Sequence, residues 1–213
     1  MTPRSRPVSR NWYDKGTKRA FDLAVLIAAH IVLLPVWVLL WTVIPTVIWL
    51  ADRGPVFFRQ ERAGKGGRPF TVYKVRTMVP DADRTGPLRT EPGDPRITPV
   101  GKWLRRTALD ELPQVIAIWQ GRMSFVGPRA LAAQEQEDLE VNDRDFALRL
   151  QVRPGLTGLS QVKNLVDDPH EKLRFDLDYI HRMSLWLDVT LIAQSAFNTV
   201  LARWDARRGR ARK

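Results

Sequence analysis

The chain contains no cysteine and has few acidic side chains for its size. Its 213 residues include 23 Asp and Glu against 34 Lys and Arg, which gives a formal net charge of +11 at pH 7. The lack of cysteine excludes a disulfide framework and a thiolate zinc site, and it suits a reducing compartment. The basic residues are mainly arginine, 26 against eight lysines. Because guanidinium groups pair bidentately with phosphate, this charge suits nucleic acid, an anionic membrane surface or phosphorylated substrates, and charge alone does not choose among them.

Internal repeats and long low-complexity stretches are also absent. The length suits one compact domain plus a membrane segment, and with 44% apolar residues the chain can bury a core. We expect a flexible basic arm over 1–17, a membrane segment over 18–52, a globular domain over 53–204 and a basic tail over 205–213.

A single long run of the sequence carries no charge, the 29 residues from Leu23 to Ala51. A bilayer core needs about 20 apolar residues in helix, so the run is long enough to enter a membrane, and it is too long for the apolar part of a signal peptide. Basic residues flank both ends, which by the positive-inside rule places both ends on the cytoplasmic side. Pro35, near the middle, interrupts the helical hydrogen bonds. We therefore favour a re-entrant membrane helix broken at Pro35 over the alternative, a spanning helix with a proline kink.

The remainder predicts a mostly helical α/β domain. Strands are expected at 56–59 and 70–75, joined as a hairpin by the glycine-rich turn at 63–67. Five prolines between 80 and 99 predict a loop. Helical patterns follow at roughly 110–120, 130–150, 170–182 and 184–204. Trp186 and Trp204, near the ends of the last pattern, suit an amphipathic helix at a membrane interface, although a buried core helix explains the spacing equally well.

Two adjacent carboxylates, Asp110 and Glu111, are the strongest candidates for chemistry. Thr107, three residues before Asp110, has the spacing of a capping box, whereas Pro113 favours a helix that starts nearer Asp110. Both interpretations place the pair within about a turn of a helix N-terminus, where free N–H groups favour ionised carboxylates and phosphate. An ionised carboxylate can attack phosphorus to form an acyl phosphate, and its neighbour can hold Mg²⁺. The competing interpretation is that both residues are ordinary helix caps.

Basic side chains surround this pair in the sequence. A catalyst of diphosphate cleavage must offset negative charge that spreads over several oxygens, and arginine and Mg²⁺ do so. A solvated basic face is the simpler interpretation, but the turn formed by Gly127 and Pro128 fixes the backbone before Arg129 and aims its guanidinium. The basic residues near the pair are Arg96, Lys102, Arg105, Arg106, Arg122 and Arg129.

Read in order, several segments resemble the bacterial sugar transferase family, the monotopic phosphoglycosyl transferases that initiate glycoconjugate assembly. The resemblance covers about residues 15–195, with matching order and spacing. Its motifs are Lys18-Arg19-Ala20-Phe21-Asp22, residues 54–64 and 72–78, Asp94-Pro95-Arg96-Ile97-Thr98, Gly101, Leu104-Arg105, Asp110-Glu111-Leu112-Pro113-Gln114, residues 123–129 and Pro154-Gly155-Leu156-Thr157-Gly158.

The resemblance implies a reaction in which a sugar phosphate moves from a UDP-sugar to a polyprenol (undecaprenyl) phosphate and UMP is released. It implies Mg²⁺ dependence and a two-step exchange through a covalent sugar-phosphate enzyme, the first membrane step of glycoconjugate or exopolysaccharide biosynthesis. Asp110 would be the nucleophile and Glu111 the metal ligand, within a catalytic domain over 53–204. The side chains expected to hold substrate phosphates are Lys74, Arg76, Arg105 and Arg129.

The same resemblance implies a place for the protein in the cell. It predicts a re-entrant membrane helix, interfacial amphipathic helices and an active site on the cytoplasmic face of the bacterial inner membrane, in contact with anionic lipid. It leaves a homodimer open, and we expect no nucleic-acid partner. Four residues depart from the family's usual pattern without touching the carboxylate pair. They are Val75 in place of Phe, Ala117 in place of Asn, Arg122 in place of an acidic residue and Ala130 in place of the second Pro of Pro-Arg-Pro.

Three other hypotheses start from the same residues. A membrane-anchored nucleic-acid-binding protein would explain the charge but not the carboxylate pair, and it predicts salt-sensitive binding. A phosphohydrolase would use the same aspartyl chemistry with water as the acceptor. A structural scaffold of a glycan-assembly complex would be indifferent to loss of the Asp110 carboxylate.

Overall fold

The computed structural model describes residues 13, 16–32, 34–82, 84–86, 93–163 and 168–200, and within these ranges it leaves out the side chains of residues 36, 39, 52 and 200. Most of the predicted arm over 1–17, Trp204 and the whole predicted tail over 205–213 lie outside the described residues.

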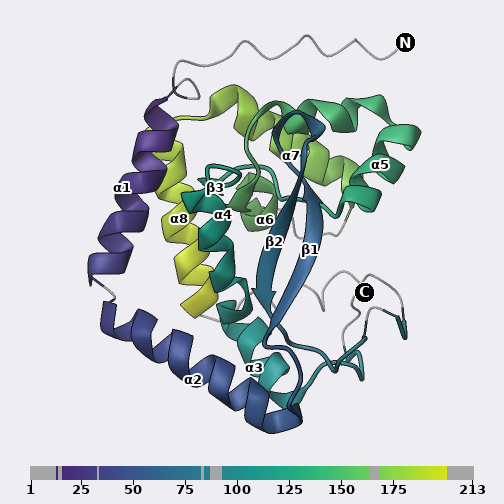
Figure 1. The fold of residues 1–213 in the computed structure, drawn as a ribbon. Coiled ribbons are helices and arrows are strands. Elements are labelled where there is room, and N and C mark those ends of the chain that lie inside the picture. The colour runs from purple at the N-terminus through teal and green to yellow at the C-terminus, as the bar shows by residue number, and fades with distance from the viewer. Residues whose placement is uncertain are drawn as a thin grey trace.

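The long apolar run forms two helices that lie at an angle to each other (Figure 1). α1 (Thr17–Val32) runs along one side of the molecule, and α2 (Leu34–Asp52) turns away from its lower end and continues beneath the rest of the chain. Pro35 is the second residue of α2, a position where the missing N–H would have no intrahelical partner in any case. Within the described residues, no helix is both long and apolar enough to cross a membrane.

The predicted hairpin is confirmed, and its first strand is longer than expected. β1 (Phe57–Ala63) pairs with β2 (Pro69–Val75) in an antiparallel register that sets Arg62 opposite Phe70 and Phe58 opposite Lys74. The 3-10 turn η2 (Lys65–Gly67) joins the strands, and Gly66 adopts a φ of 69°, a backbone region that favours glycine.

Short helices and a second two-stranded sheet make up most of the remaining chain (Figure 1). The elements in order are α3 (Pro99–Thr107), η3 (Leu109–Gln114), α4 (Val115–Trp119), β3 (Ser124–Val126), α5 (Ala133–Asn142), η4 (Arg144–Gln151), β4 (Gly155–Thr157), α6 (Leu159–Lys163), α7 (Pro169–Arg182) and α8 (Leu185–Val200). Strands β3 and β4 pair in parallel. The four predicted helical patterns correspond to η3 with α4, to α5 with η4, to α7 and to α8, so the prediction of a mostly helical α/β domain is confirmed.

Three features were not predicted: α3, the five-residue helix α6 and the β3–β4 sheet. The proline-rich segment was expected to continue as loop through Pro99, but Pro99 is the first residue of α3, where proline is well tolerated. Thr98 caps this helix, because its hydroxyl accepts a hydrogen bond from the Gly101 N–H at 2.9 Å. Strands of three residues are too short for an alternating pattern to be visible in sequence.

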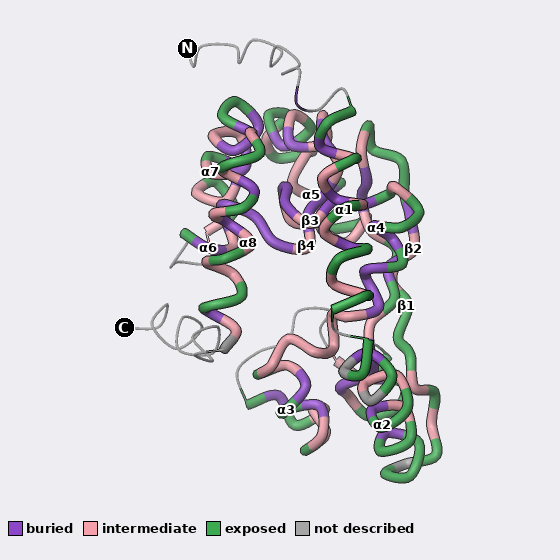
Figure 2. Tube along the Cα trace, turned by 90° about the vertical axis from the view of Figure 1, so that its left-hand side faces the viewer, coloured by how far each residue is buried: buried purple, intermediate pink, exposed green. Residues whose placement is uncertain are grey.

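Three groups of buried apolar side chains hold these elements together. One lies under α7 and α8, the second joins α1 and α2 to β2 and α4, and the third joins α2 to β2 and α3. Figure 2 shows that much of α2 faces away from these groups and is exposed. Three of the four departures from the family pattern, Val75, Ala117 and Ala130, are buried in the core, and Arg122 is exposed. The changes at Val75, Ala117 and Ala130 therefore lie in the core, and the change at Arg122 lies at the surface.

A buried polar network fastens α1 to the rest of the domain. Lys18 forms an ion pair with Asp188 of α8, and the hydroxyl of Tyr179 donates to the same carboxylate at 2.7 Å. One turn further along α1, the carboxylate of Asp22 accepts hydrogen bonds from the Ser124 hydroxyl and from a backbone N–H of β3. Since all these groups are buried, they fix the position of α1 on the domain.

Candidate active site

The site begins where α3 packs closely against the segment that follows β2. A Cβ added to Gly101 would lie 1.9 Å from the carbonyl oxygen of Thr77, so this approach requires glycine. The close packing brings Arg105 of α3 to Thr77, and the Arg105 Nε donates a hydrogen bond to the Thr77 hydroxyl at 2.7 Å. Held in this way, the charge of Arg105 also acts on the carboxylate pair, because it lowers the pKa of Asp110 in part.

Asp110 and Glu111 lie in the first turn of η3, in agreement with the predicted helix start. The predicted cap was wrong, because Thr107 is the last residue of α3 and its hydroxyl donates to carbonyl groups one turn earlier in that helix. The residue before η3 is instead Ala108, whose φ of 56° and ψ of 17° lie in the left-handed region that is rare for alanine. Because η3 has only six residues, side chains rather than a long helix dipole set the electrostatics of the pair.

Two cations hold the carboxylate of Glu111. The Lys74 Nζ lies 2.7 Å from Glu111 Oε1, and an Arg129 nitrogen lies 3.4 Å from the same oxygen. Burial alone would raise the pKa of Glu111, but the charges of Lys74 and Arg129 outweigh burial and keep this pKa well below its usual value. Glu111 is therefore ionised at any physiological pH.

At Asp110, the effects that raise the pKa outweigh those that lower it. Burial, followed by the negative charge of Glu111, raises the pKa of Asp110 from 3.8 to about 6, although Lys74 and Arg105 lower it in part. At neutral pH this carboxylate is mostly ionised, yet it is more basic than an ordinary aspartate. A more basic oxygen anion is a stronger nucleophile, so the two neighbouring carboxylates suit different roles.

A buried ion pair supports the loop that carries Arg129. The guanidinium of Arg149 donates to the Asp176 carboxylate at 2.9 and 2.6 Å, and one of its nitrogens also donates to the Arg129 carbonyl at 2.8 Å. The Ser160 hydroxyl donates to the second Asp176 oxygen at 2.7 Å. Because these side chains are buried, the backbone of Arg129 is fixed and its guanidinium is directed toward Glu111.

A small pocket lies beside the pair, and the Lys74 and Arg129 side chains that hold Glu111 form part of its lining. Arg62 contributes a third cation to it, and sequence reasoning missed this residue. Its guanidinium donates to the Ala130 carbonyl at 2.8 Å, and burial together with the neighbouring Arg129 lowers its pKa to about 10, which leaves it charged at neutral pH. The hairpin register offers a signal that could have found it, because Arg62 and Lys74 point to the same face of β1 and β2. The lining residues are Arg62, Val72, Lys74, Gln114, Arg129, Ala130, Gly155 and Leu156.

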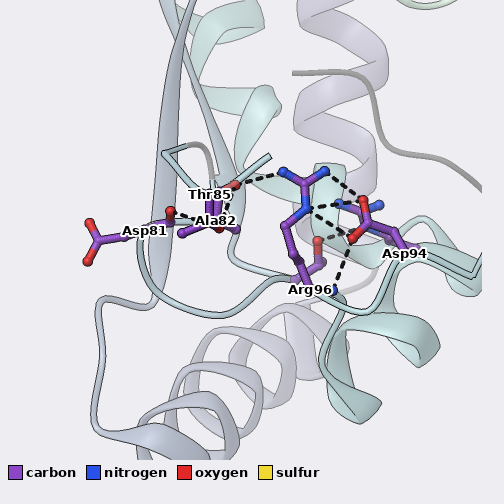
Figure 3. Close-up of polar contacts among 7 residues, drawn as sticks. Asp81, Ala82, Thr85, Asp94 and Arg96 are labelled. Carbon is purple, nitrogen blue, oxygen red and sulfur yellow. Dashed lines mark hydrogen bonds and ion pairs between the residues drawn. The ribbon is translucent and has the colours of Figure 1, made fainter. Parts of the chain in front are cut away.

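Of the predicted phosphate-binding side chains, Lys74, Arg105 and Arg129 gather around the carboxylate pair. Arg76 lies elsewhere: it is buried, and its guanidinium packs against Gly54. A Cβ added to Gly54 would lie 2.9 Å from the guanidinium nitrogens of Arg76. Arg96, from the same basic cluster in sequence, is engaged within its own loop, as Figure 3 shows. Its guanidinium donates hydrogen bonds to both carboxylate oxygens of Asp94, the shortest at 2.6 Å. It also donates a hydrogen bond to the Ala82 carbonyl at 2.7 Å.

The carboxylates suit a hard divalent cation of the kind predicted. Among the residues that the structure describes, no three acidic or histidine side chains form a cluster that could hold a metal. Mg²⁺, however, commonly takes only one or two carboxylates and completes its shell with water and substrate phosphate. Glu111 is ionised, and its Oε1 accepts hydrogen bonds from Lys74 and Arg129, so Glu111 and Asp110 are the carboxylates that would hold Mg²⁺.

Comparison with known proteins agrees with this arrangement. The family model described as bacterial sugar transferase matches residues 13–202. The chain belongs to the bacterial sugar transferase family. The family match covers the hairpin, the carboxylate pair and the loops that carry Arg129 and Gly155, so every side chain of the site lies within it.

Three relatives show the range of names within this family. An undecaprenyl-phosphate glucose phosphotransferase of Komagataeibacter xylinus is 37% identical over 93% of this chain and 38% of its own length. A UDP-N-acetylgalactosamine-undecaprenyl-phosphate N-acetylgalactosaminephosphotransferase of Aeromonas hydrophila is 36% identical over 89% of this chain and 45% of its own. The exopolysaccharide production protein ExoY of Sinorhizobium fredii is 34% identical over 88% of this chain and 87% of its own. The chain thus spans less than half the length of the first two relatives and most of the third.

Proposed function

We propose that the protein transfers a sugar phosphate from a UDP-sugar to undecaprenyl phosphate, giving undecaprenyl-diphosphate-sugar and UMP. The observation that carries the proposal is the ionised Glu111 between Lys74 and Arg129, with the more basic Asp110 beside it. A carboxylate nucleophile next to fixed cations suits cleavage of a diphosphate. The names of the relatives support the substrate class, and ExoY supports a role in exopolysaccharide production.

The reaction takes two displacements at one phosphorus. An ionised oxygen of Asp110 attacks the β-phosphorus of the UDP-sugar, the bond from that phosphorus to the bridging oxygen breaks, and UMP leaves with the bridging oxygen. The sugar phosphate remains on Asp110 as an acyl phosphate. A phosphate oxygen of the lipid then attacks the same phosphorus, the acyl bond breaks, and Asp110 regains its carboxylate. Both nucleophiles are anions, so neither step needs a general base.

Each cation of the site has a task in this reaction. Lys74 and Arg129 keep Glu111 ionised and offset charge on the oxygens of the transferred phosphoryl group. Arg105, held by Thr77, acts on Asp110 through its charge and suits the second phosphate of the donor. Mg²⁺ held by Glu111 would supply further charge neutralisation on the phosphates.

We extend the proposal to the membrane: α1 and α2 form a re-entrant hairpin on the cytoplasmic side of the bacterial inner membrane. The exposed apolar residues of these helices and of α8 support it, because soluble surfaces seldom expose so many large apolar side chains. The Trp49 ring beside Arg53 and the highly exposed Trp186 suit the interfacial region. The most exposed apolar side chains described in α1, α2 and α8 are Ile31, Val32, Leu34, Val38, Leu50, Trp186 and Phe197.

The reaction is tested by UMP release from detergent-solubilised protein with Mg²⁺, undecaprenyl phosphate and a panel of UDP-sugars. We expect lipid-dependent release from at least one donor, its loss in Asp110→Asn, and no change in Glu137→Gln, an exposed carboxylate on α5. Continued release of UMP without the lipid, beyond one equivalent per enzyme, would favour a phosphohydrolase. Equal release by Asp110→Asn would contradict the assigned nucleophile.

The membrane arrangement is tested separately, because the chain has no cysteine that would interfere with labelling. Ser5→Cys lies before α1, and Arg68→Cys lies at the exposed hairpin turn. In inverted membrane vesicles both thiols should react with a membrane-impermeant maleimide, because a re-entrant hairpin keeps both on the cytoplasmic side. Reaction of only one of them would indicate a spanning helix.

A further inference from the structure

The pocket beside the carboxylate pair contains one cation that has no task in the reaction as described so far. Arg62 belongs to β1, and its guanidinium donates hydrogen bonds to the Ala130 carbonyl at 2.8 Å and to the side-chain oxygen of Gln60. Among the residues that the structure describes, Arg62 forms no ion pair, and Glu111 and Glu135 act on it only through their more distant charges. Two neutral oxygens therefore orient this guanidinium and leave its charge unbalanced.

Two other arginines of the chain show how such a charge is ordinarily satisfied. Arg149, which is buried, pairs with Asp176 at 2.6 Å, and Arg96 pairs with Asp94 at the same distance. Removing a guanidinium from water costs free energy that a carboxylate normally offsets. Arg62 is removed from water strongly enough to lower its pKa, and no carboxylate lies in contact with it in the described part of the chain.

A second guanidinium adds to this imbalance. Arg129 lines the same pocket, and after burial its positive charge is the largest influence on Arg62. Glu111 is already bonded to Lys74 and Arg129, so three cations share the one carboxylate that is bonded to them. Like charges at this range repel one another unless an anion lies between them. The pocket is therefore built to receive an anion between Arg62 and Arg129.

The proposed reaction brings three phosphate groups to the site, two from the donor and one from the lipid. Arg105, which suits the second phosphate of the donor, is not part of the lining of this pocket. Lys74 and Arg129, which suit the transferred phosphoryl group, both line it. The phosphate that reaches Arg62 is on this ground the transferred one.

We propose that Arg62 is a further catalytic residue, which together with Arg129 binds the oxygens of the transferred phosphoryl group in both displacements. The inference rests on the proposed function and adds a residue to it. A guanidinium presents paired N–H groups that match two phosphate oxygens, and negative charge on these oxygens must be offset while the phosphorus changes partners. Because every donor of this class carries that phosphoryl group, the contact is independent of which sugar is transferred.

The first test measures binding without turnover, in protein that also carries Asp110→Asn. Calorimetry with Mg²⁺ compares UMP with UDP, whose terminal phosphate stands for the transferred group. Arg62→Met should lose about 10- to 100-fold in affinity for UDP and stay within about twofold for UMP. Arg59→Met is the matched control, because Arg59 is an exposed arginine on the opposite face of the same strand, and both of its affinities should stay within about twofold.

The second test separates the two displacements in protein with Asp110 intact. The rate of the UMP burst is measured without lipid, and undecaprenyl phosphate is then added to the sugar-phosphate enzyme that has accumulated. Arg62→Met should slow both steps by about 100-fold, since the same phosphoryl group reacts in each. Arg59→Met should change neither.

The alternatives give different results. A normal burst followed by a slow reaction with the lipid would place Arg62 on the lipid phosphate, and an equal loss of affinity for UMP and UDP would make it a support of the Ala130 backbone or a ligand of the second phosphate. Either result would overturn the inference while the proposed function stands. Thermal unfolding without nucleotide establishes that Arg62→Met is folded, and Arg62→Gln, which lacks the charge but keeps an amide donor, carries the same expectations if it is not. A wild type that releases UMP from no donor would instead contradict the proposed function, and the inference with it.

Discussion

The opposite environments of Asp110 and Glu111 predict opposite effects on stability when each charge is removed. Asp110 is held in a site that disfavours its ionised form, with its pKa raised from 3.8 to about 6. A group with a raised pKa contributes stability that is present below its unfolded pKa and is lost as the pH rises through its folded pKa. Asn cannot ionise, so Asp110→Asn keeps at high pH the stability that the wild type has lost.

The magnitude follows from this pKa. The difference between 3.8 and about 6, at 1.36 kcal/mol for each tenfold change in proton affinity, sets an upper value of about 3 kcal/mol. Relaxation and solvent reduce it, so we expect Asp110→Asn to be more stable than the wild type by about 1–3 kcal/mol at pH 8. For a chain of this length that is an increase in Tm of about 2–12 °C. The difference should shrink below pH 6 and vanish below pH 4.

The assay is thermal unfolding from pH 4 to pH 8, in EDTA and without nucleotide, because a bound cation would favour the ionised carboxylates. Glu111→Gln should behave in the opposite way and lower the Tm at pH 8, since the pKa of Glu111 is depressed by Lys74 and Arg129. Glu137→Gln, an exposed carboxylate, should change little. Two carboxylate variants that shift the Tm in the same direction at pH 8 would refute the reasoning.

Three further predictions follow from the same contacts. With Mg²⁺ present, kcat/KM should rise with pH and level off at or below about pH 6, because Asp110 must be ionised to attack and a bound cation favours its ionised form; a kcat/KM that falls as the pH rises from 4 to 7 would contradict this. Arg149→Met breaks the buried ion pair with Asp176, so the free energy of unfolding should fall by about 3–5 kcal/mol. The kcat/KM should also fall, because the Arg129 carbonyl loses the hydrogen bond from Arg149. A variant as stable as the wild type would contradict this prediction. At Ala108, substitution by Val should cost about 1–2 kcal/mol and by Gly less than about 0.5 kcal/mol, because the backbone is left-handed there; equal stabilities would contradict it.

Several parts of the fold could be predicted because they depend on local patterns. The hairpin followed from the glycine-rich turn at 63–67 between two apolar strands, and the helices from their spacing of apolar residues. The helix start at the carboxylate pair was also correct, although its cap was not. The predicted cap was wrong because Ala108 adopts a left-handed backbone conformation. Alanine seldom does so, and the neighbouring residues give no sign of it.

The parts that could not be predicted depend on contacts between distant segments. Arg62 became visible as a site residue only when the register of β1 and β2 was known, because that register places Arg62 on the same face as Lys74 beside one pocket. Arg96 was assigned to a basic cluster, and its pairing with Asp94 satisfies it within its own loop. The buried Arg149 lies 20 residues from Arg129 in the sequence, so its support of that loop requires the folded chain.

The central claim is that Asp110 carries the sugar phosphate between the two substrates. The most direct measurement is rapid-mixing UMP release with Mg²⁺ and the active UDP-sugar in the absence of undecaprenyl phosphate, with the intact protein and its proteolytic peptides analysed by mass spectrometry. The account predicts a burst of UMP close to one equivalent per enzyme, a hexose-phosphate adduct on the peptide that contains Asp110, and neither in Asp110→Asn. UMP release that appears only when the lipid is present, with no adduct at any time, would indicate direct transfer between the substrates and would contradict the account.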